Sequence, residues 1–136
     1  MNSFLQNATV VLVHGAWADG SCWQNVILPL RRQGLKITCA PIPLTSLTDD
    51  IAALQRVLER ITGPVVLTGH AYGGAVIAAP YDDRVKSLVY VAALAPDEGK
   101  RSQMCFIALI RIRMLRASHP MSMVLSGCRK RVSAMR

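Results

Sequence analysis

The stretch from Thr68 to Ala75 (TGHAYGGA) constrains the fold of this chain more than any other feature. The β-branched apolar run Val65–Thr68 leads into it, and the small-residue run Gly74–Ala79 follows it. A strand that bends at once into a helix needs glycines on both sides of the bend, because a Cβ would meet the neighbouring strand and helix. The sequence therefore predicts a strand, a tight turn and a helix in immediate succession.

Strands and helices alternate through the rest of the first 99 residues. Short, β-branched apolar runs predict further strands at Thr9–Val13, Lys36–Ala40 and Val85–Val91. Alternation of this kind favours an α/β fold, in which a parallel sheet is covered by helices on both faces.

Two longer helices are expected between these strands. The first spans Ser21–Gln33 with an apolar stripe and a kink at Pro29. In the second, Thr48 is the expected cap, two aspartates occupy the first turn, and apolar residues recur at helical spacing from Ile51 to Ile61.

Composition limits the class of protein. A chain of 136 residues that is 51% hydrophobic, with a mean hydropathy of +0.30, is long and apolar enough for one folded domain. No apolar run is long enough to cross a bilayer, and no charged segment precedes the first apolar run, so a cytoplasmic location is expected. The four cysteines lack metal-binding spacing, which predicts reduced thiols, no metal site and no cofactor.

The charge changes abruptly near residue 100. Residues 1–99 hold seven Lys/Arg and eight Asp/Glu, whereas residues 100–136 hold nine Lys/Arg, no acidic residue and five of the six methionines. Periodicity is also lost there, and no helix or strand is expected after Gly99. The pattern predicts a domain over 1–99 and an irregular basic tail over 100–136.

We hypothesise that residues 100–136 are out-of-frame sequence. A shift of one nucleotide near the Gly99 codon can give a reading frame whose translation has charges of both signs and loop prolines. Such a shift would account for the basicity and the lost periodicity together. Sequencing the gene across the Gly99 codon is expected to show one missing base. An unbroken frame that recurs in close relatives would contradict the hypothesis.

The turn has the form glycine, any residue, nucleophile, any residue, glycine, but Ala71 occupies the nucleophile's position. Nucleotide-binding turns are also glycine-rich. The stretch lacks both the Lys-Ser/Thr ending of a P-loop and the spacing of a dinucleotide fingerprint, so the hydrolase interpretation is favoured.

Three segments resemble the α/β-hydrolase superfamily: VLVHGAWADGSCW, GHAYGG and VKSLVYVAALAPDEG. They are most similar to its small esterase, methylesterase and hydroxynitrile-lyase group, over the N-terminal part only. The resemblance implies the N-terminal half of that fold, with the later strands and cap missing.

The resemblance also implies roles for individual residues. Ala71 takes the position of the catalytic serine, and Ala16 and Tyr72 supply the backbone N–H groups of the oxyanion hole. The residues that shape the elbow are Gly69, His70, Gly73 and Gly74, and those of the pocket are His14, Gly15 and Trp17. Trp17 is compatible with lining the acyl pocket or with plain packing, and both histidines with structural hydrogen bonding.

Several functions stay open at this stage. The favoured one is a hydrolase-family protein without activity, because neither the serine nor a matching acid and histidine follows; His119 is the only later histidine. The alternatives are a non-catalytic module for a small ester-like ligand, an engineered serine-to-alanine variant, and a tail that binds nucleic acid unspecifically. No specific nucleic acid and no membrane is expected as a partner, and the sequence does not indicate an oligomeric state.

A sheet without its later strands is expected to leave one edge unpaired and apolar surface exposed. We therefore expect poor solubility of the isolated chain.

Overall fold

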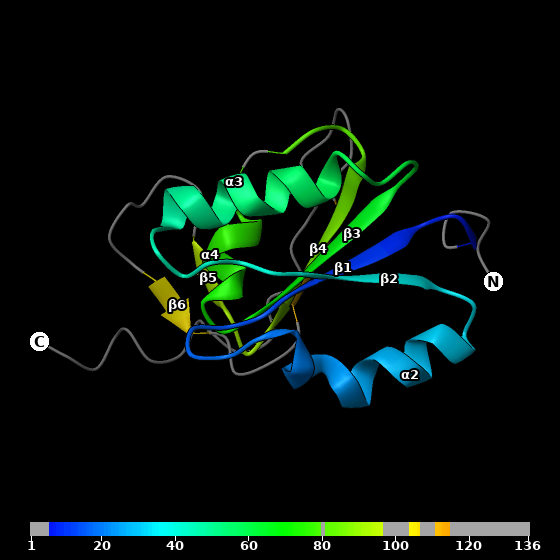
Figure 1. The fold of residues 1–136 in the computed structure, drawn as a ribbon, viewed down its shortest axis with the longest axis horizontal. Helices are drawn as coiled ribbons and strands as arrows, with labels where there is room; N and C mark the ends of the chain where they lie inside the picture. The colour runs from blue at the N-terminus through cyan, green and yellow to red at the C-terminus, as the bar shows by residue number, and fades with distance from the viewer. Residues whose placement is uncertain (1–5, 80, 97–103, 107–110, 115–136) are drawn as a thin grey trace, which may run out of the picture.

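The computed structural model describes residues 6–79, 81–96, 104–106 and 111–114, and within them a twisted sheet separates two layers of helix (Figure 1). The order of its strands is β2 (Lys36–Ala40), β1 (Thr9–Val13), β3 (Val65–His70), β4 (Val85–Val91) and β7 (Arg111–Met114). The pairs β1–β2, β1–β3 and β3–β4 are parallel. The prediction of an α/β fold with a parallel sheet is confirmed.

Strand β1 lies inside the sheet, between β2 and β3, and all five of its residues are buried. Side chains alternate between the two faces of a strand. Val11 and Val13 therefore join the larger core cluster with helix α3 (Leu47–Leu58), whereas Val10 and Leu12 pack with Trp23 on the opposite face. Burial on both faces explains why the strand reads as a continuous apolar run.

Helix α3 begins two residues earlier than the sequence indicated. Ser46, and not Thr48, is the N-cap, and its hydroxyl oxygen accepts a hydrogen bond from the Asp49 amide at 3.0 Å. Both residues carry a hydroxyl, so composition did not distinguish them. The predicted apolar stripe is correct, since Leu54 and Leu58 are buried against the sheet.

The predicted helix over Ser21–Gln33 is two elements. A 3-10 turn, η1 (Gly20–Trp23), precedes helix α2 (Gln24–Arg32), and Pro29 lies inside that helix without ending it. Trp23 alone of the predicted stripe is buried, while Val26 is 38% exposed. Helix α2 thus covers its face of the sheet more loosely than α3 covers the other.

Two short strands lie where no element was expected. Strand β6 (Met104–Phe106) pairs antiparallel with β5 (Leu94–Pro96), and β7 pairs antiparallel with β4. The expectation that no strand follows Gly99 is therefore wrong at these two segments. The backbone hydrogen bonds of β7 satisfy the outer side of β4.

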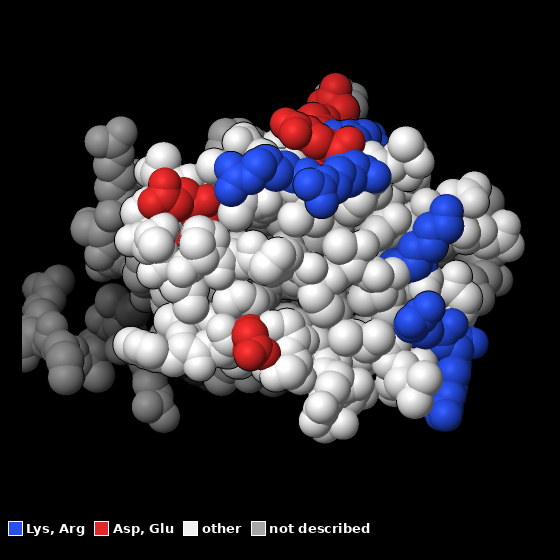
Figure 2. Space-filling model, in the orientation of Figure 1, with Lys and Arg blue, Asp and Glu red and all other residues white. Residues whose placement is uncertain are grey.

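Charges of both signs share the face that α3 presents (Figure 2). Within the described residues, no helix is long and apolar enough to cross a membrane.

Candidate active site

The bend after β3 is a left-handed turn at Ala71, whose φ is 50°. Its carbonyl oxygen accepts two hydrogen bonds, from the Gly74 amide at 3.1 Å and from the Leu94 amide at 2.9 Å. These bonds fix the plane of the peptide that joins Ala71 to Tyr72. Helix α4 (Gly73–Ile77) begins directly afterwards, one residue before the predicted start and two short of the predicted end.

The glycines around the turn have no room for a side chain. A Cβ added to Gly69 would lie 2.6 Å from the Gly73 carbonyl oxygen, and one added to Gly73 would lie 2.5 Å from the Val13 carbonyl oxygen. A Cβ on Gly74 would collide with the Leu94 carbonyl oxygen. The sequence-based requirement for small residues at this turn is confirmed.

The loop after β1 meets this turn. Parallel register pairs Val13 with Gly69, so the chain leaves both strands at the same edge of the sheet. A Cβ added to Gly15 would lie 3.0 Å from the Ala71 Cβ and 3.3 Å from the His70 carbonyl oxygen. The segments that the sequence analysis combined, HGAW and GHAYGG, are in contact.

The resemblance assigned the backbone amides of Ala16 and Tyr72 to an oxyanion hole. Within the described part of the chain, the backbone N–H groups of Ala16 and Tyr72 donate no hydrogen bond. Trp17, the predicted pocket residue beside them, has a left-handed φ of 57° and is 99% exposed.

The histidines and Trp23 pack behind the turn. The His14 side chain is buried, and its Nδ1 donates a hydrogen bond to the Gly15 carbonyl oxygen at 2.9 Å. Trp23 meets the His70 ring edge-to-face, with 6.2 Å between ring centroids. Both contacts agree with structural roles for these histidines.

Sequence reasoning missed a buried carboxylate next to the turn. Asp50 is 0% exposed, and its Oδ2 accepts a hydrogen bond of 2.6 Å from the Tyr72 hydroxyl. Burial, followed by the hydrogen bond and the charge of Asp50, raises the pKa of Tyr72 to about 12. The signal was present in the sequence: Asp50 stands four and eight residues before Leu54 and Leu58, on the buried stripe of the helix.

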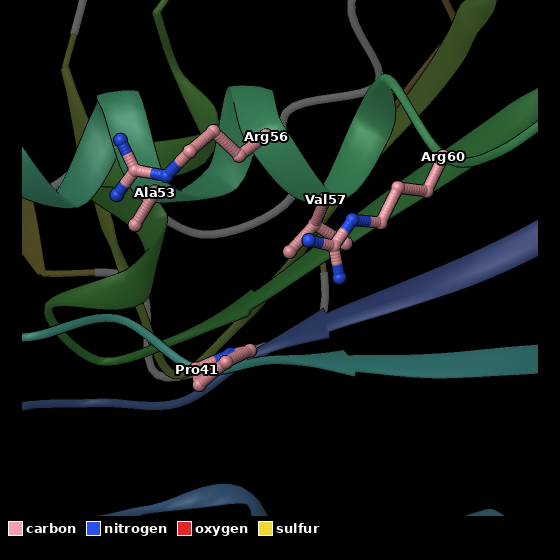
Figure 3. Close-up of a pocket in the computed structure, with 5 residues that line it drawn as sticks. All are labelled: Pro41, Ala53, Arg56, Val57 and Arg60. Carbon is pink, nitrogen blue, oxygen red and sulfur yellow. The ribbon is translucent and has the colours of Figure 1, made fainter.

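A surface hollow of about 210 Å³ lies between α3 and the residue that follows β2 (Figure 3). Arg56, Val57 and Arg60 line one side, with Pro41 opposite them. None of its lining residues belongs to the turn or to the HGAW loop. In the part of the chain that is described, no three His, Cys, Asp or Glu side chains are grouped to hold a metal.

Comparison with known proteins gives one consistent result. The model of the alpha/beta hydrolase family matches residues 10–131. A carbendazim hydrolyzing esterase from Nocardioides sp. (strain SG-4G) is 31% identical over 107 residues, which cover 68% of this chain and 44% of that protein. Methylesterase 3 from Arabidopsis thaliana is 30% identical over 105 residues, which cover 65% of this chain and 40% of that protein.

Solved structures agree with these relatives. A pyrethroid hydrolase from Sphingobium faniae JZ-2 superimposes with a TM-score of 0.56 at 27% identity, over 64% of this chain and 40% of that one. The chain thus spans less than half the length of the proteins that it matches.

Proposed function

We propose that this chain, which belongs to the alpha/beta hydrolase family, is an esterase-type scaffold without hydrolytic activity of its own. The observation that carries the proposal is Ala71, held in a left-handed turn with its Cβ against Gly15 of the HGAW loop. This is the place at which an esterase of this family would hold its attacking hydroxyl.

The chemistry of residue 71 argues against covalent catalysis. Acyl transfer begins when a hydroxyl or thiol adds to the ester carbonyl, and the methyl group of alanine has no lone pair with which to add. Loss of the nucleophile from a catalytic triad lowers kcat on the order of a millionfold. The site would still have the backbone amides of Ala16 and Tyr72, which would bind the carbonyl oxygen of an ester or the oxygen of an acid.

A restored serine would still need a base. In this family the order along the chain is nucleophile, acid and histidine. His119 is the only histidine after residue 71 in these 136 residues, no acidic residue follows Glu98, and His119 lies outside the described residues. We therefore expect that a hydroxyl at residue 71 alone is not enough for turnover.

The test compares the chain with its Ala71→Ser variant, using p-nitrophenyl acetate as the substrate. We expect hydrolysis by either protein to stay at the buffer rate, because serine without a general base is a weak nucleophile. Ala52→Ser, at a half-buried alanine of α3, is the matched control for adding a hydroxyl elsewhere. Brisk turnover by Ala71→Ser that a fluorophosphonate blocks would show that the base is present and contradict the proposal.

Ligand binding without catalysis is the second candidate function, because the two amides are free of partners among the described residues. It differs from an inert scaffold in one measurable respect. Saturable stabilisation of the unmodified chain against heat by a small ester would support it.

A further inference from the structure

We infer that Asp50 is a positioning residue: through the Tyr72 hydroxyl, it holds the Tyr72 amide where that amide would bind an oxyanion. The inference rests on the proposed function, which assigns the oxyanion hole to Ala16 and Tyr72. It concerns a buried carboxylate that no step of acyl transfer uses.

The carboxylate is fully engaged. Oδ1 accepts a hydrogen bond from the Leu44 amide at 2.7 Å, and Oδ2 accepts the one from the Tyr72 hydroxyl. Leu44 itself has a left-handed φ of 60°, so the loop before α3 is bent at the point where it reaches Asp50. One buried side chain thus joins this loop, helix α3 and the turn.

Residue 72 is held from two sides. On the backbone side, the two hydrogen bonds to the Ala71 carbonyl oxygen fix the peptide plane that also contains the Tyr72 N–H. On the side-chain side, Asp50 holds the phenol 22 residues away in sequence. By contrast, the side-chain hydrogen bonds Thr45–Asp49 and Asp82–Arg84 are exposed and local.

The electrostatics keep this link intact. A phenol donates its hydrogen bond only while protonated, and burial and Asp50 both disfavour the phenolate. Because its pKa is about 12, the Tyr72 hydroxyl stays protonated and remains a donor at neutral pH. A bond between a charged acceptor and a neutral donor is also stronger than one between neutral groups.

The test uses the unmodified chain and its Asp50→Ala and Tyr72→Phe variants, with the backbone amide of residue 72 observed by ¹⁵N NMR. In the parent we expect one sharp signal that moves when phenylacetate, a small carboxylate probe, is added. In both variants we expect the signal to broaden or split and the affinity for phenylacetate to fall about tenfold. The double variant should be no worse than either single one, because both remove the same link.

The matched control is Tyr81→Phe. It deletes another half-buried phenol, whose hydroxyl donates to the Val76 carbonyl oxygen at 2.8 Å, away from Asp50. This variant should lose stability while the Tyr72 amide signal stays sharp. An unchanged signal of the residue 72 amide in both Asp50→Ala and Tyr72→Phe would overturn the inference and leave Asp50 a purely structural residue.

The two proposals can fail separately. If the parent does not respond to phenylacetate, the binding site of the proposed function fails, whereas broadening in the variants still supports the positioning role. If Asp50→Ala does not fold, Tyr72→Phe decides the inference alone, because it keeps the carboxylate and its bond to the Leu44 amide.

Discussion

Replacing Gly73 with alanine is expected to destabilise the chain by about 3 kcal/mol or more, a large part of the roughly 5–15 kcal/mol by which domains are stable. The added Cβ would lie 2.5 Å from the Val13 carbonyl oxygen and 2.8 Å from that of His14. Both atoms are backbone, so neither can move aside without separating β1 from the turn. Thermal unfolding followed by circular dichroism should show a melting temperature lower by roughly 10 °C or more.

Gly20→Ala is the control for this prediction. Its new Cβ would meet the Cys39 side chain, at 3.3 Å from the Cβ and 3.9 Å from the Sγ. A side-chain contact of this length can relax, so the expected loss is below about 1 kcal/mol. Equal melting temperatures for the two variants would mean that the turn does not approach β1 as closely as described.

Truncation of Leu54 to alanine is expected to cost about 2–5 kcal/mol, because the side chain is 0% exposed in the larger core cluster and its loss leaves a cavity. Leu47 lies on the same helix but is 45% exposed. Leu47→Ala should therefore cost less than about 1 kcal/mol. Urea unfolding of the two variants side by side measures the difference directly.

The Leu54 comparison also tests the sheet-facing side of α3. If Leu54→Ala cost no more than Leu47→Ala, Leu54 would not lie in the core as described, and Asp50, one turn before it on the same face of α3, would not be buried there. A larger loss at Leu54 supports the orientation on which the buried carboxylate depends.

Much of the fold could be predicted because its local signals agree with its packing. Strands Thr9–Val13, Lys36–Ala40 and Val85–Val91 have the predicted bounds, since each is a short apolar run that contains β-branched residues. The glycine turn was equally predictable from the sequence, because only residues without a Cβ fit there.

What could not be predicted depends on contacts between distant segments. The Asp50–Tyr72 hydrogen bond joins residues that are 22 apart in the sequence. The helix dipole already explained an acidic residue in the first turn, so the sequence offered no reason to seek a partner for Asp50. Strand β7 (Arg111–Met114) also pairs with a distant segment, β4; its residues alternate polar and apolar as a strand does, but a run of four residues was too short to stand out in the basic tail. Backbone hydrogen bonding at an open edge accepts almost any sequence.

The antiparallel attachment of β7 also decides where another strand could be recruited. Among the described residues, β4 has neighbours on both sides, so another strand could join that end of the sheet only beyond β7, whose sequence RIRM holds two arginines. The opposite outer strand is β2, which has β1 as its single neighbour in that part of the chain and begins with an exposed lysine, Lys36. Both outer strands of the described sheet thus contain cationic residues, which discourage edge-to-edge pairing between molecules.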